Sequence, residues 1–97
     1  MIVEGVNDVK QAGRKEYDIA GTSVMVKHFV TRDTTPENPF KPHKHEQQEL
    51  WYIIKGEASY FEDGKETIVK EGALIIIKPW VEHGLRTNSN VKWICLG

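Results

Sequence analysis

The sequence has little cysteine and no long apolar run, and each lack excludes a class of protein. Cys95 is the single cysteine among 97 residues, so no internal disulfide forms and we expect a reducing, cytoplasmic setting. Its expected role is that of a small buried apolar residue on the last strand. Since no run of about 18 apolar residues occurs, we expect no membrane span. The first residues also lack the basic-then-apolar pattern of a secretory signal.

The chain has no excess of charge of one sign. It carries 13 basic and 14 acidic residues, a formal net charge of −1. A nucleic-acid surface needs a basic excess, so we expect no nucleic-acid partner. Because repeats and linkers are also lacking, we expect one domain over residues 1–97 with a single modest core. Residues 1–21 are expected to form an N-terminal extension or a further strand.

Short β-type segments separated by turn signals fill the rest of the chain. Residues 21–33 alternate between two faces, with Val24, Val26, His28 and Val30 on one of them. Residues 48–55 are rich in aromatic and β-branched residues. Asp63-Gly64 predicts a tight hairpin, because both residues tolerate positive φ. The remaining predicted strands are 57–63, 65–71, 73–78, 81–87 and 91–97.

No segment beyond residue 20 has a clean helical stripe, and only residues 5–17 are ambiguous among strand, short helix and loop. Strands of this length with short turns are typical of an all-β sandwich or barrel. The sequence therefore predicts an all-β fold.

Two histidines lie just before the segment 48–55, and a glutamate lies near its start. Residues i and i+2 of a strand point the same way, so His43 and His45 can direct two imidazoles into one space. Glu49 adds a carboxylate, and His83 is a fourth candidate downstream. These groups suit divalent first-row metals. The alternative is that they are solvated surface residues, as is common for a bare H-x-H.

The position of Glu49 favours the metal interpretation. In an alternating strand Glu49 shares its face with Trp51 and Ile53, which predicts that its carboxylate is buried. A buried charge requires a partner or a metal.

These residues carry a resemblance to a known family. His43-x-His45, three residues, Glu49, six residues and Gly56 resemble the first motif of the cupin superfamily, in small single-domain members. Gly72 and His83 match the glycine and histidine of its second motif. The resemblance covers roughly residues 22–96. The departures place Glu37, Lys78, Trp80 and Thr87 where the family has glycine, proline, glycine and asparagine, with Pro79 and Asn88 one residue away.

The resemblance implies a fold and a metal site. The implied fold is a small jelly-roll β-barrel, the double-stranded β-helix of cupins. The implied ligands are His43, His45, Glu49 and His83, because all four metal-binding positions of the family are occupied. The departures therefore bear on turn geometry more than on metal binding. The metal would be Mn, Fe, Co, Ni, Cu or Zn, which spacing does not distinguish.

Three functions remain open on the sequence. The first is a metal-binding small cupin that binds or transforms a small organic molecule at a site of three histidines and one glutamate inside the barrel. If it is an enzyme, metal-dependent dioxygenases, isomerases and decarboxylases of similar architecture are the models, and fold does not choose among them. The others are a non-catalytic ligand-binding module and a purely structural dimeric barrel.

Several residues near these motifs have two interpretations. Lys78, Trp80 and Arg86 flank His83 and could hold an anionic or aromatic ligand at the barrel mouth. Alternatively, Trp80 packs on the rim while the two charges are solvated, which we favour for the charges. His28 is expected to be a core or pocket-lining histidine rather than a fifth ligand.

The outer face of the segment 48–55 predicts a homodimer. If Glu49 faces inward, then Leu50, Tyr52 and Ile54 face outward, and that face is apolar. The apolar residues 73–77 are expected to extend this outer face. Contiguous apolar patches usually mark interfaces, so we expect a two-fold dimer packed through outer sheet faces.

Overall fold

The computed structural model describes residues 14–18, 26 and 28–97, and they form nine β-strands. Residues 1–13, 19–25 and 27 lie outside the described residues, and so do the expectations that concern them. Within the described part there is no helix long and apolar enough to cross a bilayer. The strands are β1 (Arg14–Asp18), β2 (His28–Thr34), β3 (Phe40–His43), β4 (Glu49–Lys55), β5 (Glu57–Glu62), β6 (Lys65–Lys70), β7 (Leu74–Ile77), β8 (His83–Arg86) and β9 (Val91–Leu96).

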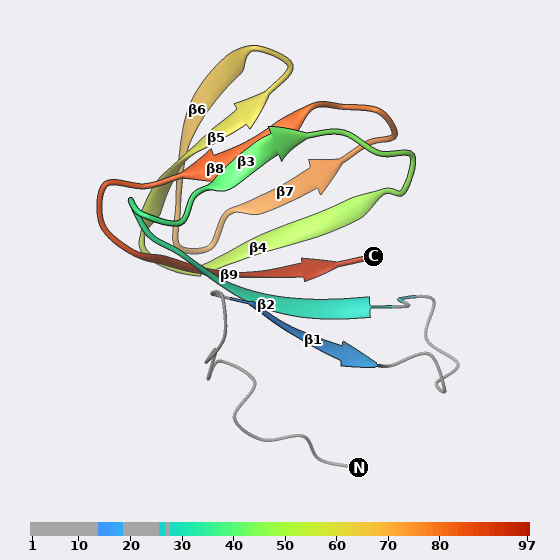
Figure 1. The fold of residues 1–97 in the computed structure, drawn as a ribbon, viewed down its shortest axis with the longest axis horizontal. Helices are drawn as coiled ribbons and strands as arrows, with labels where there is room; N and C mark the ends of the chain where they lie inside the picture. Colours follow the sequence, from blue (N-terminus) through green and yellow to red (C-terminus); the bar gives the residue numbers. More distant parts are fainter. Residues whose placement is uncertain (1–13, 19–25, 27) are drawn as a thin grey trace.

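The strands form two antiparallel sheets stacked as two layers (Figure 1). One sheet has the order β1-β2-β9-β4-β7, and the other has the order β3-β8-β5-β6. Without β1, the two sheets have four strands each, and consecutive strands pass repeatedly from one sheet to the other. This is the connectivity of a jelly roll. The all-β jelly-roll prediction is confirmed.

The predicted hairpin is present between β5 and β6. Glu62 pairs with Lys65, so the turn consists of two residues. Asp63 and Gly64 have φ values of +45° and +85°. Two positive φ values fit the right-handed twist of the flanking strands. The hairpin prediction is therefore confirmed, and the positive φ values on which it was based are present.

The core lies between the inner faces of the two sheets. Trp51 and Ile53 of β4 are fully buried, while Leu50 and Tyr52 are 38% and 40% exposed. This alternation confirms the predicted inward face of β4. Each fully buried large side chain contributes about 1.5–3 kcal/mol to stability. The other core residues are Val30, Ala58, Tyr60, Ile75, Ile77, Leu85, Val91, Trp93 and Cys95.

Gly56 ends β4 at a point where two backbones nearly touch. Its φ is +98°, and a Cβ atom there would lie 2.3 Å from the carbonyl oxygen of Asn90. Only glycine allows both this backbone conformation and this approach. The glycine at the end of the first motif thus has a local steric cause, namely the passage of β4 beside the start of β9.

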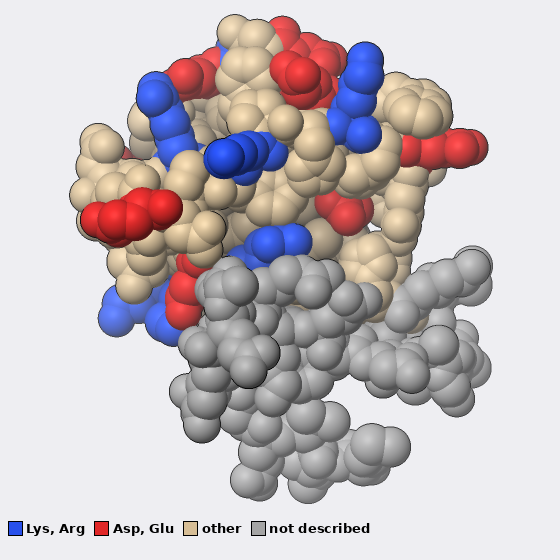
Figure 2. Space-filling model, viewed as in Figure 1, with Lys and Arg blue, Asp and Glu red and all other residues tan. Residues whose placement is uncertain are grey.

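The charged side chains do not segregate by sign on the viewed surface. Figure 2 shows Lys and Arg side chains interspersed with Asp and Glu side chains over the described residues of that face. The balanced composition of the sequence is therefore reflected in a mixed surface.

Candidate metal centre

Pairing between β3 and β8 brings two of the candidate histidines together. His43 is the last residue of β3 and His83 is the first residue of β8, and they are direct cross-strand partners. Directly opposed residues have Cβ atoms about 4.5–5.5 Å apart. Pro42 is tolerated in β3 because β3 is an edge strand. The two imidazoles therefore meet because of strand register.

His45 reaches the same place from a loop. The prediction that His43 and His45 share one strand was wrong, since β3 ends at His43. The loop is held instead by a hydrogen bond from the Trp80 N–H to the His45 carbonyl oxygen, 2.8 Å long. The turn before β8 thus positions a histidine that follows β3.

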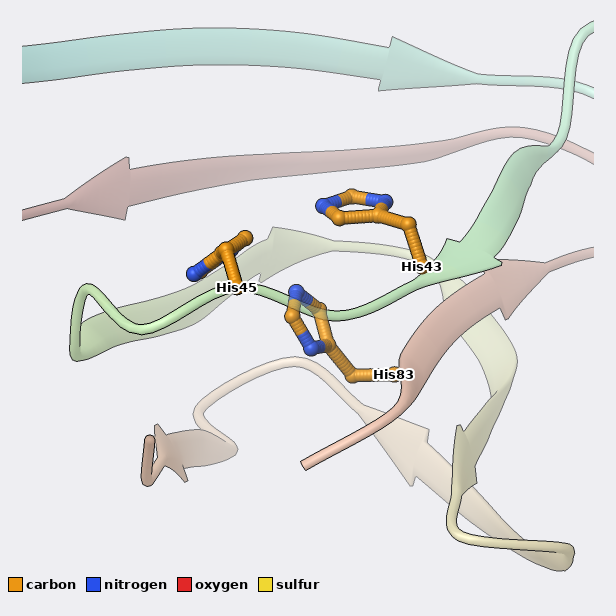
Figure 3. Close-up of side chains that lie close together, drawn as sticks. All are labelled: His43, His45 and His83. Atoms are coloured by element: carbon orange, nitrogen blue, oxygen red, sulfur yellow. The ribbon is translucent and has the colours of Figure 1, made fainter. Parts of the chain in front are cut away.

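The three imidazoles converge on one space. One ring nitrogen from each of His43, His45 and His83 lies within 4.8 Å of the other two. Ring centroids are 4.6 Å apart for His43 and His83 and 4.8 Å apart for His45 and His83. Figure 3 shows the rings gathered about this space. Such a group of three imidazoles can hold a first-row divalent metal.

Backbone carbonyls orient two of the rings for this task. The Nδ1 of His83 donates to the Val81 carbonyl at 2.7 Å, and the Nδ1 of His43 donates to the Lys41 carbonyl at 3.3 Å. A carbonyl only accepts, so these bonds place the proton on Nδ1. The lone pair on each Nε2 is then available to a metal.

Burial makes the centre suitable for neutral imidazoles. His83 is 0% exposed, and burial lowers the pKa of His83, with His43 and His45 lowering it further. The Nε2 of His83 and both ring nitrogens of His45 are buried without a hydrogen-bond partner among the described residues. Buried polar atoms are normally partnered. These residues therefore fit a bound metal, which would take up one nitrogen of each ring.

Glu49 lies beside the histidines at the start of β4. Its Oε1 is 3.4 Å from the Nε2 of His45 and 3.9 Å from the Nε2 of His83. Trp51 donates an indole N–H to the same oxygen at 3.2 Å. The carboxylate is 13% exposed. Glu49 is thus adjacent to His45 and His83, whereas the group whose ligand atoms all lie within 4.8 Å of one another consists of the three histidines alone.

A second group shares Glu49, and the sequence did not single it out. His28, Glu49 and Cys95 also offer ligand atoms within 4.8 Å of one another. The Nε2 of His28 lies 3.8 Å from Glu49 Oε2 and 3.9 Å from Cys95 Sγ. Burial, followed by the charge of Glu49, raises the pKa of Cys95 to about 12. In the metal-free protein the thiol of Cys95 is therefore harder to deprotonate than an exposed thiol.

The other residues considered near the motifs lie in the cavity or on the surface. His28 lines a cavity inside the barrel, as expected of a pocket-lining residue. Arg86 points to the outer face, where its guanidinium lies 2.8 Å from Glu66 Oε2. Lys78 is exposed, and Trp80 is 61% exposed. The interpretation of Lys78 and Arg86 as surface charges is confirmed.

The comparison with protein families identifies the fold type. The model of the cupin domain matches residues 33–97, more than half of the chain. The chain belongs to the cupin family. The match begins within β2 and includes every residue of the candidate metal centre in this cupin.

Solved structures of other cupins share the fold at low sequence identity. A cupin-like protein from Thermotoga maritima has 21% identity and a TM-score of 0.74, over 87% of this chain and 65% of that protein. A Cupin 2 conserved barrel domain protein from Salinispora arenicola has 15% identity and a TM-score of 0.74, over 86% and 71%. No curated protein matches the chain.

A third structure is described as a predicted oxalate decarboxylase from Thermotoga maritima. It has 23% identity and a TM-score of 0.67, over 73% of this cupin. The matched part spans 64% of that protein's length. At this identity the likeness shows the fold alone.

Proposed function

We propose that this cupin binds one first-row divalent metal through His43, His45, Glu49 and His83 and uses the site to bind or transform a small organic molecule. The proposal is supported by the convergence of the three imidazoles and by the buried ring nitrogens of His45 and His83, which have no hydrogen-bond partner among the described residues. Left unpaired, each buried polar atom costs about 1–3 kcal/mol. A metal ion removes that cost.

The chain's own residues prepare the site for this role. A bound metal supplies Lewis acidity or redox chemistry. His43 and His83 are held by backbone carbonyls, and Glu49 is held by the indole of Trp51. Phe40 lies against His43, Trp51 and Trp93, with ring centroids 4.7, 5.0 and 5.4 Å away. These aromatic walls keep the inner side of the site apolar, which strengthens interactions with a bound ligand.

Binding is better supported than a particular reaction. Among the described residues that line the cavity, His28 is the one imidazole outside the proposed ligand set. A general base must lie within hydrogen-bond reach of the proton it removes, so His28 is the residue to test once a ligand is known. A non-catalytic ligand-binding protein remains the second candidate function, since the same cavity serves it.

Metal content tests the proposal. Protein is expressed without an affinity tag, purified without chelator and measured by ICP-MS. We expect about one metal per chain for the wild type and a large loss in His83→Ala, because each imidazole ligand contributes directly to affinity.

His28→Ala is the matched control, since it removes an imidazole from the same barrel interior outside the proposed ligand set. It should retain the metal. If His28→Ala loses the metal while His83→Ala keeps it, the ion lies in the group of His28, Glu49 and Cys95. A wild type without stoichiometric metal would favour a purely structural barrel.

We also propose that the protein is a homodimer in a reducing, cytoplasmic compartment. The buried free thiol of Cys95 suits such a compartment. Leu74 and Ile76 of β7 are 59% and 57% exposed, and they pair with Tyr52 and Leu50 on the same outer face. The two rows form a contiguous apolar patch on a sheet edge, which is suited to a second copy of the same patch.

A further inference from the structure

Three neighbouring strands bring a histidine, a cysteine and a glutamate together on the inner face of one sheet. β9 lies between β2 and β4 (Figure 1). His28 and Gly97 are directly opposed, since each backbone N–H donates to the other's carbonyl oxygen, at 2.8 and 3.2 Å. Cys95 shares the face of Gly97, because residues two apart on a strand point the same way. Cys95 also pairs with Trp51 of β4, whose face Glu49 shares.

The lack of a side chain at Gly97 lets the ring of His28 extend over the end of β9. A Cβ atom at position 97 would lie 2.9 Å from His28 Cε1, well inside the ~3.5–4.0 Å at which carbon atoms pack. The ring therefore occupies space that a side chain would otherwise fill. In this position its Nε2 lies 3.9 Å from Cys95 Sγ and 3.8 Å from Glu49 Oε2.

These separations fit ligands that share one ion. Nitrogen, oxygen and sulfur ligands lie about 2.0–2.3 Å from a zinc-like ion, so two of them are about 3.5–3.8 Å apart in a trigonal arrangement. The distances from His28 to Cys95 and Glu49 are close to that spacing, and all three ligand atoms lie within 4.8 Å of one another. An ion of low coordination number therefore fits between them with small movements.

The group of His28, Glu49 and Cys95 opens into a cavity that gives an ion room. The cavity has a volume of about 180 Å³, and all three residues line it. Cys95 is buried, whereas the side chain of His28 is 21% exposed. An ion can thus reach the thiol by way of His28, at the side of the group that is open to solvent.

This group is distinct from the three histidines, although Glu49 lies between the two. Glu49 Oε1 is the oxygen near His45, at 3.4 Å from its Nε2, and Glu49 Oε2 is the oxygen near His28. The two oxygens of one carboxylate thus face different ligand groups. An ion beside His28 and Cys95 does not take the place of an ion on the histidines.

The amide of Gln47 can hold the His28 ring in the tautomer that binds a metal. Its nitrogen lies 3.3 Å from His28 Nδ1. Rotation of the amide exchanges its NH₂ group for its carbonyl oxygen, which accepts a proton from Nδ1. The lone pair of Nε2 is then available to an ion beside Cys95, because the hydrogen bond at one ring nitrogen sets the state of the other.

The chemistry of this group favours a soft, monovalent ion. A thiolate selects soft metals such as copper(I), and imidazole is also a copper ligand. When copper(I) binds, the S–H bond of Cys95 breaks, an S–Cu bond forms, the proton leaves to solvent and no electron is transferred. One positive charge replaces another. A divalent ion would instead add a charge to a cavity that is lined by apolar side chains such as Val30 and Trp93, which costs free energy.

We propose that His28 and Cys95 form a second metal site in this cupin, which binds one copper(I) ion with Glu49 Oε2 as a third, weaker donor. The site uses none of the three clustered histidines, so it does not rest on the proposed divalent centre. His28 remains a residue of the cavity wall, and it serves a different ion rather than acting as a fifth ligand of the divalent metal.

Anaerobic titration with copper(I) tests the proposal. The chromophoric chelator bicinchoninate competes with wild type that carries one equivalent of zinc, and in parallel with metal-free wild type. We expect one tightly bound copper(I) per chain of the zinc-loaded protein. Cys95→Ser should weaken this binding by more than about 100-fold and His28→Ala by at least about 10-fold, because even the outer partners of metal ligands contribute about 10- to 100-fold.

His83→Ala is the matched control, since it removes an imidazole from the other ligand group. It should lose zinc and retain copper(I), whereas Cys95→Ser should retain zinc and lose copper(I). Thermal unfolding shows whether each variant is folded, and Cys95→Ala replaces Cys95→Ser if the buried hydroxyl prevents folding. X-ray absorption at the copper edge needs no variant, and we expect one sulfur and at least one imidazole nitrogen in wild type.

The outcomes separate this site from the divalent centre. Copper(I) held by nitrogen alone, or with equal affinity in wild type and Cys95→Ser, overturns the inference. So does the failure of wild type to take copper(I) from the chelator. If zinc does not bind, the divalent centre is contradicted, but copper(I) bound through sulfur in the metal-free protein still supports the second site.

Discussion

His83 joins three features in one side chain. It is fully buried, its Nδ1 proton is committed to the Val81 carbonyl, and its Nε2 faces two other imidazoles. A fully buried imidazole with neighbours that also become cationic disfavours its own protonated form. The same physics that makes His83 a good metal ligand therefore makes the metal-free protein sensitive to acid.

We predict that metal-free protein loses stability on acidification through His83. The pKa of His83 is lower in the folded state than the unfolded value of about 6.5. At acidic pH the unfolded chain then binds more protons than the folded protein does. The contribution of His83 to stability is therefore fully present above the unfolded pKa and is lost as the pH falls through the lower folded pKa.

Urea unfolding at pH 8 and pH 5 measures this effect. His83→Gln cannot titrate, so the variant should lose less stability between the two pH values than the wild type does. The comparison concerns the change with pH, so any destabilisation by the substitution itself cancels. Parallel losses in the two proteins would contradict the account.

The sequence predicted the site residues unevenly. The four proposed ligands were predictable because their spacing resembles a known motif, and Glu49 also precedes apolar residues that fix its inward face. Arg32, which lines the cavity beside His43 and Glu49, was missed, although it continues the face of His28 and Val30. A single inward arginine has no motif, and only the pairing of β2 with β9 shows that position 32 faces the core.

At the scale of elements, the turn before β8 has an unusual backbone. Trp80 has a φ of +64°, although it is not glycine, and its side chain is 61% exposed. The left-handed conformation costs a residue with a Cβ about 1–2 kcal/mol. The resemblance noted for the sequence places glycine at this position. Trp80 therefore adopts the left-handed backbone conformation that glycine would adopt at this position.

We predict that Trp80→Gly is more stable than Trp80→Ala by about 1 kcal/mol, because only glycine adopts this φ without strain. Both variants lose the indole and retain the backbone N–H that donates to His45. The difference between them thus isolates the backbone. Urea unfolding of the two metal-free variants measures it. Equal stability, or a more stable alanine variant, would show that residue 80 does not adopt a positive φ in solution.

The second motif also departs at Thr87, and the structure shows how that position functions. The Thr87 hydroxyl donates to the Glu57 carbonyl at 2.7 Å and accepts from the Ser89 N–H at 3.2 Å. It thus connects the turn after β8 with the start of β5. At Trp80 and Thr87 the turns are therefore held by other means than the residues of the motif, while the positions that the resemblance implies for metal binding are occupied.

Strand positions were predictable where alternation and turn chemistry agreed. The β5–β6 hairpin and the inward face of β4 were both predicted for the correct reasons. The position of His45 was not predicted, because the loop after β3 is held by a hydrogen bond from residue 80, which is distant in sequence. Contacts of this kind have no local signal.

At the scale of the whole molecule, we predict a dimer through the outer face of β4 and β7. An interface of at least ~1,000 Å² in total is typical of a stable assembly. Light scattering at micromolar concentration should give the mass of two chains. The double variant Leu74→Glu, Ile76→Glu should be monomeric, because two-fold symmetry brings like charges together.

Ile68→Glu is the matched control, since Ile68 is 65% exposed on β6 of the other sheet. It should remain dimeric. A wild-type mass of one chain would overturn the dimer, and dissociation by Ile68→Glu alone would move the interface to the opposite sheet.

The central claim is that the metal binds to the three histidines and Glu49. X-ray absorption of zinc-loaded protein tests it most directly, because nitrogen and sulfur ligands differ in distance. We expect a first shell of nitrogen and oxygen at about 2.0–2.2 Å with the multiple-scattering signature of imidazole. A sulfur at about 2.3 Å would instead place the ion on Cys95 with His28 and contradict the account.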